Sequence, residues 1–175
     1  MRVLELYSGI GGFAQAVGDH ATVVTAIDHN QLANQVYQAN FNHPLLVKNL
    51  ESITDKRLAS IDADLWWMSP PCQPYTIRGS QRDLDDPRSR SFIRITRAIR
   101  DLTPTHIAFE NVPWFQHSNG HAHLLQTLSD AGYQWIEAMV CPSQLGIPNI
   151  RKRYYLVASQ HPLAAAQPPM RHSTS

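Results

Sequence analysis

The chain has 175 residues, about the length of one domain, with 43% hydrophobic residues, 17% charged residues and a formal net charge of +1. This composition excludes a disordered chain, and no apolar run approaches the roughly 20 residues that a membrane-spanning helix needs. No apolar signal region follows Met1, and Cys72 and Cys141 are by themselves too few for a disulfide framework or a four-ligand zinc site. We therefore expect a soluble, cytoplasmic protein without a membrane partner.

Strand-like and helix-like segments alternate along the chain. Apolar, β-branched runs predict strands, and apolar residues at helical spacing predict helices. Strands separated by helices indicate an α/β fold with a doubly wound, mostly parallel sheet, whereas the last two strands are joined without a helix and should be antiparallel. In chain order, we expect strands at 3–6, 22–27, 45–47, 64–68, 106–109, 133–140 and 154–158, and helices at 12–17, 31–41, 89–102 and 121–131.

The domain is expected to occupy residues 1–159. Within it, residues 69–87 combine proline, glycine, arginine and aspartate and are predicted to form a long loop. Residues 160–175 are rich in proline, alanine and histidine and lack periodicity, which predicts a disordered tail.

Four groups of chemically distinctive residues follow predicted strands. Residues 9–12 follow the first strand, Asp28 the second, Pro71-Cys72 the fourth and Glu110-Asn111 the fifth. The carboxyl ends of parallel strands lie at one edge of a sheet, where α/β proteins bind their ligands. We therefore expect these groups to form one site.

The turn after the first strand fits the G-x-G-x-x-[G/A] pattern with Gly9, Gly11 and Ala14, and Asp28 follows at a spacing typical of an acid that binds ribose hydroxyls. Glycines let the backbone approach a ligand closely, and the helix start offers free N–H groups. The pattern alone is compatible with a nicotinamide dinucleotide, with S-adenosylmethionine, or with a tight turn that binds nothing.

The Pro70-Pro71-Cys72 segment and Glu110 have the chemistry of a nucleophile and a general acid. Prolines hold the Cys72 thiol in a stiff loop, where Arg78 or another cation would lower the thiol pKa. Glu110 ends an apolar strand, where burial would raise the carboxyl pKa towards neutral. The alternatives are an inert buried cysteine and a glutamate that caps the following helix.

The basic residues are concentrated in two segments. Of the 15 Lys and Arg residues, seven are arginines within residues 78–100, and three more are Arg151, Lys152 and Arg153. Such concentration indicates a local anionic partner, although a solvated helix face or a charged edge strand would have the same pattern. Arg151 and Arg153 share one face of a strand. No metal site is expected, because no acid or cysteine completes the histidine set, which consists of His117, His121 and His123.

Together these segments resemble the cytosine-C5 methyltransferase family over residues 1 to about 159. The resemblance is carried by residues 4–13 (LELYSGIGGF), 69–74 (SPPCQP), 110–112 (ENV) and 149–153 (NIRKR). Residues 3–9 (VLELYSG), 26–28 (AID), 70–76 (PPCQPYT) and 145–149 (LGIPN) most resemble the eukaryotic-type branch, whose studied members methylate transfer RNA. Bacterial sequences of this type are usually taken to be DNA methylases.

The resemblance implies a Rossmann-like methyltransferase fold, S-adenosyl-L-methionine as the methyl donor and cytosine C5 as the acceptor. It implies that the Cys72 thiolate adds to C6 of the base while Glu110 protonates or hydrogen-bonds N3. Arg153 together with Arg151 would hold the base, and Asn111 would orient the region of Glu110 and Pro71.

The resemblance also implies two sets of binding residues. S-adenosyl-L-methionine is expected to contact Tyr7, Ser8, Gly9, Ile10, Gly11, Gly12, Asp28, His29, Asn49, Leu50, Ser69 and Pro71. The target base must be flipped out or single-stranded, because C5 and C6 are stacked inside a helix. Contacts to the nucleic acid are expected from Gln73, Arg78, Arg82, Arg88, Arg90 and Arg94.

The sequence departs from the family pattern in three ways. Asn149 replaces the usual Gln, Asn49 stands where many members have Asp, and the family's target-recognition domain and final returning helix are not found. We therefore expect a catalytic part that methylates DNA, with transfer RNA as the alternative substrate. A further alternative is an inactive or split-enzyme subunit that needs a second chain with the recognition domain. A nicotinamide-dependent oxidoreductase would explain only the glycine turn and Asp28.

Overall fold

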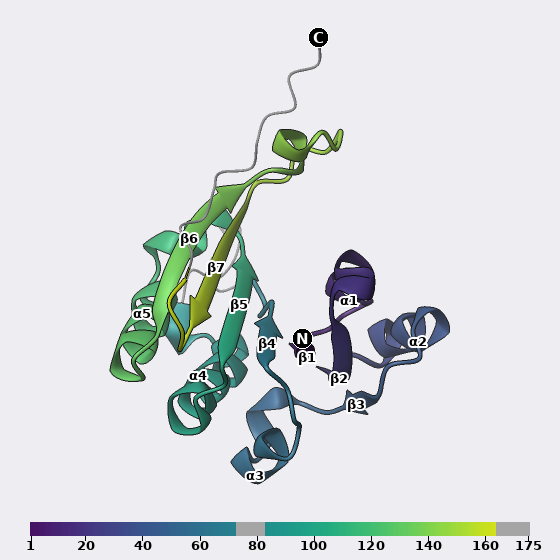
Figure 1. Cartoon of the computed structure of the whole chain (residues 1–175), viewed down its shortest axis with the longest axis horizontal. Helices are drawn as coiled ribbons and strands as arrows, with labels where there is room; N and C mark the ends of the chain where they lie inside the picture. The colour runs from purple at the N-terminus through teal and green to yellow at the C-terminus, as the bar shows by residue number, and fades with distance from the viewer. Residues whose placement is uncertain (73–82, 164–175) are drawn as a thin grey trace.

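The computed structural model describes residues 1–72 and 83–163, in which strands and helices alternate (Figure 1). Short 3₁₀ turns occupy several connections, among them η2 (Leu50–Ser52), η4 (Asp83–Asp85), η5 (Pro87–Ser89) and η6 (Pro113–His117). No helix in these two ranges is long and apolar enough to cross a membrane. The main elements are β1 (Arg2–Leu6), α1 (Gly12–Val17), β2 (Thr22–Asp28), α2 (Gln31–Asn40), β3 (Leu45–Val47), α3 (Asp55–Ala59), β4 (Leu65–Met68), α4 (Arg90–Leu102), β5 (His106–Asn111), α5 (Asn119–Asp130), β6 (Gln134–Val140) and β7 (Arg153–Ser159).

The described strands form one seven-stranded sheet in the order β3-β2-β1-β4-β5-β7-β6. Strands β1 to β5 pair in parallel, whereas β7 runs antiparallel to both of its neighbours, β5 and β6. Helices α1 and α2 cover one face and α3, α4 and α5 cover the other (Figure 1). The prediction of a doubly wound, mostly parallel α/β sheet with an antiparallel last strand is confirmed.

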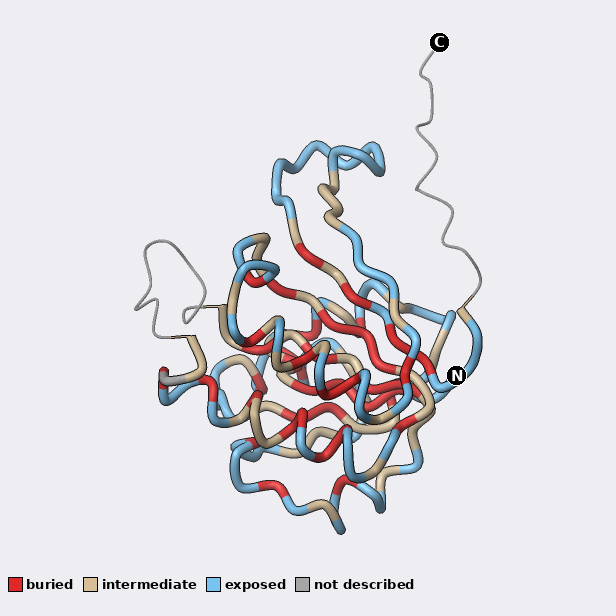
Figure 2. The backbone as a smooth tube through the Cα atoms, turned by 90° about the vertical axis from the view of Figure 1, so that its left-hand side faces the viewer, coloured by how far each residue is buried: buried red, intermediate tan, exposed pale blue. Residues whose placement is uncertain are grey.

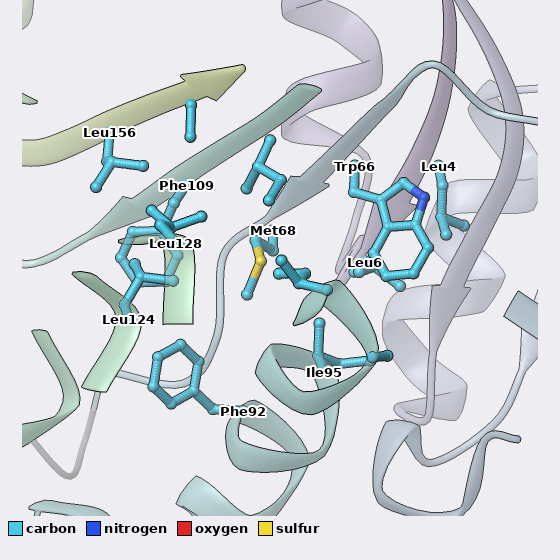
Figure 3. Close-up of a cluster of buried hydrophobic side chains, with 14 of the residues drawn as sticks. Leu4, Leu6, Trp66, Met68, Phe92, Ile95, Phe109, Leu124, Leu128 and Leu156 are labelled. Atoms are coloured by element: carbon cyan, nitrogen blue, oxygen red, sulfur yellow. The ribbon is translucent and has the colours of Figure 1, made fainter. Parts of the chain in front are cut away.

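Helix α4 packs against the centre of the sheet and forms much of the core. Phe92, Ile95 and Ile99 recur at helical spacing and are fully buried, so that they present one apolar stripe to β4 and β5. Figure 3 shows Phe92 and Ile95 pointing from this helix towards Met68 and Phe109 on those strands. Burial of each large apolar side chain contributes roughly 1.5–3 kcal/mol, which holds α4 firmly beside the ends of β4 and β5.

The opposite face of the sheet is covered unevenly. Helices α1 and α2 lie over β1, β2 and β3, whereas none of the described helices lies over β7 and β6 on this side (Figure 1). Ile136 on β6 and its in-register neighbour Val157 on β7 are therefore 36% and 40% exposed. The connection between these two strands, residues 141–152, is also largely exposed and projects from the sheet, as the pale blue segment at the top of Figure 2 shows.

Two helices differ from the sequence-based expectation. The helix expected at 121–131 begins at Asn119, because the Ser118 side chain caps it by accepting a hydrogen bond from the His121 N–H. The short helix α3 was not predicted. It spans only five residues, of which Leu58 alone is buried, so the sequence has no apolar periodicity that would indicate a helix here. Its sequence signals are the capping Thr54 and the acidic Asp55 in the first turn.

A buried carboxyl group, Glu5, lies on the α2 side of β1. The Tyr37 hydroxyl donates a hydrogen bond of 2.8 Å to Glu5 Oε2 and lies 3.0 Å from His43 Nδ1. Glu5 is 1% exposed, and burial raises its pKa to about 7 despite the hydrogen bonds from Tyr37 and from the Ala14 N–H. The native state therefore holds this proton more tightly than the unfolded chain.

Replacement of Glu5 by Gln should flatten the pH dependence of stability. With a pKa of 4.5 in the unfolded chain and about 7 in the native state, Glu5 lowers the free energy of unfolding as pH rises from about 4.5 through about 7. The loss amounts to about 3 kcal/mol, since each pKa unit corresponds to roughly 1.4 kcal/mol. Urea unfolding between pH 4.5 and 8 should show this loss in the parent chain and not in Glu5→Gln.

Glu137→Gln is the matched control for this experiment. Burial of Glu137 is outweighed by hydrogen bonds with His121 and Tyr154, and the net effect lowers its pKa. Its replacement should leave the decline between pH 4.5 and 8 in place. The same decline in Glu5→Gln would show that another group causes it.

Candidate active site

A cavity of about 580 Å³ lies at the carboxyl ends of β1, β2, β4 and β5 and beside the start of β7. Its walls hold residues from three of the four groups that the sequence predicted to converge, whereas none of the glycine-turn residues 9–12 lines it. Thirteen predicted site residues line it, namely Tyr7, Asp28, His29, Asn49, Leu50, Ser69, Pro71, Cys72, Arg88, Glu110, Asn111, Arg151 and Arg153. Five further lining residues, Glu51, Pro70, Pro87, Ser91 and Val112, were not predicted.

A second cavity of about 490 Å³ adjoins the glycine turn and shares Ser69 and Glu110 with the first. Ser8 and Gly12, which were predicted to contact the cofactor, line this second cavity. The Ser8 hydroxyl is buried and is one of the few side-chain polar atoms of the described residues without a hydrogen-bond partner. A ligand group that reached Ser8 would satisfy this hydroxyl.

The glycine turn is built around Gly11, whose φ of +92° lies in the left-handed region. A Cβ atom at this position would lie 2.3 Å from the Phe41 ring, so both the conformation and the packing require glycine. The Gly9 N–H donates a hydrogen bond of 2.9 Å to Asp28 Oδ2, which ties the turn to the end of β2. Ile10, at the tip, is 63% exposed.

Asp28 organises the backbone of the cavity as well as lining it. Besides the bond from Gly9, its Oδ1 accepts a hydrogen bond of 2.8 Å from the Asn30 N–H, where α2 begins. Each carboxylate oxygen can accept a second hydrogen bond, so Asp28 can still bind a ribose hydroxyl. The Asn49 side chain, in contrast, accepts a bond from the Glu51 N–H and caps η2.

The turn after β4 places the Cys72 thiol in the cavity. Asn111 Nδ2 donates a hydrogen bond of 3.2 Å to the Pro70 carbonyl, so that β5 fixes the proline segment directly. Cys72 is half-buried and makes no disulfide. The pKa of Arg88 is raised by its hydrogen bond to Asp86 and, to a smaller extent, by Cys72, which places its guanidinium within electrostatic range of the thiol.

Glu110 pairs with Arg153 across the β5–β7 ladder. Arg153 Nε lies 3.0 Å from Glu110 Oε1, and both side chains are about four-fifths buried. Burial raises the pKa of Glu110, although Arg153 and Arg151 oppose the rise. The carboxyl group therefore holds a proton more readily than an exposed glutamate, as a general acid must.

The arginines of the segment after Cys72 have different environments. Arg88 lines the cavity and makes a bidentate pair with the buried Asp86. The Arg90 side chain is 66% exposed and lies 3.8 Å from Glu51. Arg94 is only 17% exposed and donates hydrogen bonds to the Ile53 carbonyl and to Asp55, so it attaches α4 to the start of α3 and the segment before it. This placement does not favour the expected contact between Arg94 and nucleic acid, which stays a prediction. Gln73, Arg78 and Arg82 lie outside the described residues.

The histidines near α5 have partners within the fold. His121 Nε2 lies 2.7 Å from Glu137, and His123 Nε2 lies 2.8 Å from the Thr96 hydroxyl. Across residues 1–72 and 83–163, no group of three or more histidine, cysteine or acidic side chains could hold a metal ion.

Residues 1–174 match the family of C-5 cytosine-specific DNA methylases. The chain belongs to this family. It is 44% identical over 168 residues to a tRNA (cytosine(38)-C(5))-methyltransferase of Bos taurus, with 93% of this chain and 43% of the relative covered. It is 38% identical to a DNA (cytosine-5)-methyltransferase of Dictyostelium discoideum, with 92% and 45% covered. Among solved structures, an Entamoeba histolytica methyltransferase superposes with a TM-score of 0.88 at 34% identity, with 100% and 57% covered.

Two conclusions follow from this membership. The family uses S-adenosyl-L-methionine, which decides between the two cofactors that the glycine turn allowed. The large cavity and the Asp28 carboxylate in its wall suit such a ligand. The chain also spans only about half the length of these relatives.

Gly11→Ala should destabilise the protein, whereas Gly12→Ala should not. Alanine at Gly11 must adopt a positive φ and displace the Phe41 ring, so we expect a loss of about 1–3 kcal/mol in the free energy of unfolding. A Cβ at Gly12 meets no atom within 4 Å. Urea unfolding of both variants tests this contrast, and equal losses would contradict the packing described for Gly11.

Proposed function

We propose that this chain provides the catalytic part of an S-adenosyl-L-methionine-dependent cytosine-C5 methyltransferase that acts on transfer RNA. The observation that carries the proposal is the shared cavity, in which the Cys72 thiol, the Glu110–Arg153 pair and the Asp28 carboxylate meet. A nucleophile, a general acid and a ribose-binding acid are the groups that this reaction needs.

The reaction begins with activation of an unreactive carbon. The Cys72 thiolate adds to C6 of cytosine while Glu110 donates a proton or hydrogen bond to N3, which makes C5 nucleophilic. S-adenosyl-L-methionine, when bound, would supply an electrophilic methyl group to C5 and leave as S-adenosylhomocysteine. Transfer of the C5 proton to water and elimination of the Cys72 thiolate then restore the aromatic ring, and any proton that N3 received returns to Glu110.

The neighbours of these two residues support the proposed roles. Arg88 lines the same cavity as Cys72 and brings a positive charge to that wall. Arg153 holds Glu110 in place, and Arg151 lines the same cavity, so that both arginines can donate hydrogen bonds to the carbonyl oxygen of the base. The target cytosine must enter the cavity outside a base stack, as in a transfer RNA loop or as a flipped nucleotide.

The choice of transfer RNA over DNA rests on the sequence identity between this chain and two relatives whose names give different substrates. A relative named as a tRNA methyltransferase is 44% identical, whereas one named as a DNA methyltransferase is 38% identical. DNA, the substrate expected from the sequence, remains the second candidate, and the description of the matched family supports it. The other alternative, a subunit that binds S-adenosyl-L-methionine and needs a second chain, stays a prediction.

Incubation with tritium-labelled S-adenosyl-L-methionine and either transfer RNA or duplex DNA separates these candidates. We expect label in transfer RNA, in cytosine C5. Label in DNA alone would contradict the proposed substrate. Cofactor binding in calorimetry without transfer to either nucleic acid would support the subunit that needs a second chain.

Cys72→Ala and Glu110→Gln should impair addition to C6 to different extents. An oligonucleotide of the active substrate class that carries 5-fluorocytosine should form a stable adduct with the parent chain in the presence of S-adenosyl-L-methionine, because fluorine cannot leave as a proton does. Cys72→Ala should form none. Glu110→Gln should form it about 100-fold more slowly or worse, since general acid catalysis contributes roughly 10²–10⁴.

Cys141→Ala is the matched control, because the other cysteine lies on the exposed β6–β7 connection. It should form the adduct at the parent rate, and all three variants should bind S-adenosylhomocysteine in calorimetry. An adduct that persists in Cys72→Ala would exclude this thiol as the nucleophile.

A further inference from the structure

Tyr7 has an unusual backbone conformation for a large side chain. Its φ of +58° lies in the left-handed region, which is unfavourable for a residue with a bulky Cβ substituent. Such conformations persist only where surrounding contacts impose them, and they are frequent at functional sites. Tyr7 directly follows β1 and precedes the glycine turn, and its side chain lines the first cavity.

Three contacts hold Tyr7 in this conformation. The Ser69 hydroxyl donates a hydrogen bond of 3.3 Å to the Tyr7 carbonyl, and the Tyr7 hydroxyl donates one of 3.2 Å to Ser91 Oγ. The Tyr7 ring packs against the main core cluster. Ser69 and Ser91 are 62 and 84 residues away in the sequence, so these bonds join segments that are distant along the chain.

The two serines lie on the two segments that precede and follow Cys72 in the sequence, and both line the cavity that holds the thiol. Ser69 begins the segment that leads to Cys72, and Ser91 lies in the first turn of α4, three residues after Arg88. Arg88 and Ser91 both line the cavity, and the pairing of Arg88 with the buried Asp86 fixes the same wall. Tyr7 therefore bonds the cofactor turn to both of the segments that surround the thiol.

We propose that Tyr7 is a positioning residue whose hydroxyl, through Ser91, couples binding of S-adenosyl-L-methionine at the glycine turn to the order of the α4 wall beside Cys72. The inference rests on the proposed function. A ligand that restricts the motion of the glycine turn also restricts the motion of Tyr7. The hydrogen bond from the Tyr7 hydroxyl to Ser91 then restricts the first turn of α4. Phenylalanine at position 7 keeps the ring packing and removes the hydrogen bond to Ser91.

Amide hydrogen exchange with and without S-adenosylhomocysteine measures the coupling without any turnover. In the parent chain, the ligand should slow exchange in residues 7–12 and in residues 86–93. Tyr7→Phe and Ser91→Ala should each retain the slowing at 7–12 and lose the slowing at 86–93. We expect a difference of about three- to tenfold, the size that one neutral hydrogen bond confers.

Tyr133→Phe is the matched control, because the Tyr133 hydroxyl is also buried and donates to the Pro104 carbonyl, outside the cavity. This variant should keep both effects. Parent-like slowing at residues 86–93 in Tyr7→Phe would overturn the proposal. Loss of slowing in both segments would also overturn it, because Tyr7 would then act only as a cofactor contact.

The affinity for S-adenosylhomocysteine supplies a second, independent test. Tyr7→Phe and Ser91→Ala should each raise Kd about threefold, and the double variant should raise it no further, because both changes remove the same bond. A multiplicative, roughly ninefold increase would contradict the coupling. Failure of the parent chain to bind the ligand at all would instead contradict the proposed function, on which this inference depends.

Discussion

The ion pair between Glu110 and Arg153 is the interaction on which the site depends. A carboxyl group at the end of β5 is buried, and burial alone would favour its neutral form. The antiparallel strand β7 brings two arginines to the same place, and the 3.0 Å contact makes the buried acid tolerable. A parallel β7 would have begun at the amino end of β5, and Glu110 at the carboxyl end would have lacked this partner. The reversal of one strand thus sets the charge balance of the cavity.

The remaining walls are attached to this centre by hydrogen bonds between distant segments. Asn111 holds the proline segment before Cys72, and Asp28 holds the glycine turn. Tyr7 joins that turn to α4, whose apolar stripe anchors it to β4 and β5. Each of these side chains satisfies a backbone or hydroxyl group of another segment, so the cavity is held together largely by its own lining. Order in one wall is consequently linked to order in the others.

The sequence allowed the sheet and most of the cavity lining to be predicted, because both depend on local patterns. Apolar β-branched runs marked the strands to within one or two residues, and motif residues followed the strands that converge. Residues placed by tertiary contacts were missed. Ser91 is one of several polar residues on α4, and only its position opposite Tyr7 distinguishes it. The sequence pattern around Arg94 is typical of a phosphate contact. Its ion pair with Asp55 depends on the position of α3, a helix without apolar periodicity in the sequence.

The direction of β7 has a consequence for how the target is chosen. The strand begins at the cavity with Arg153 and ends at Ser159 beside His106, at the amino ends of the parallel strands. Seven residues of strand separate these points, roughly 20 Å at 3.3 Å per residue. Any polypeptide that continues from the end of β7 and contacts the nucleotides around the cytosine must span that distance in the reverse direction. The length and stiffness of such a tether would then set its effective concentration at the bound nucleic acid, and a separate subunit would have to replace that advantage with its own affinity.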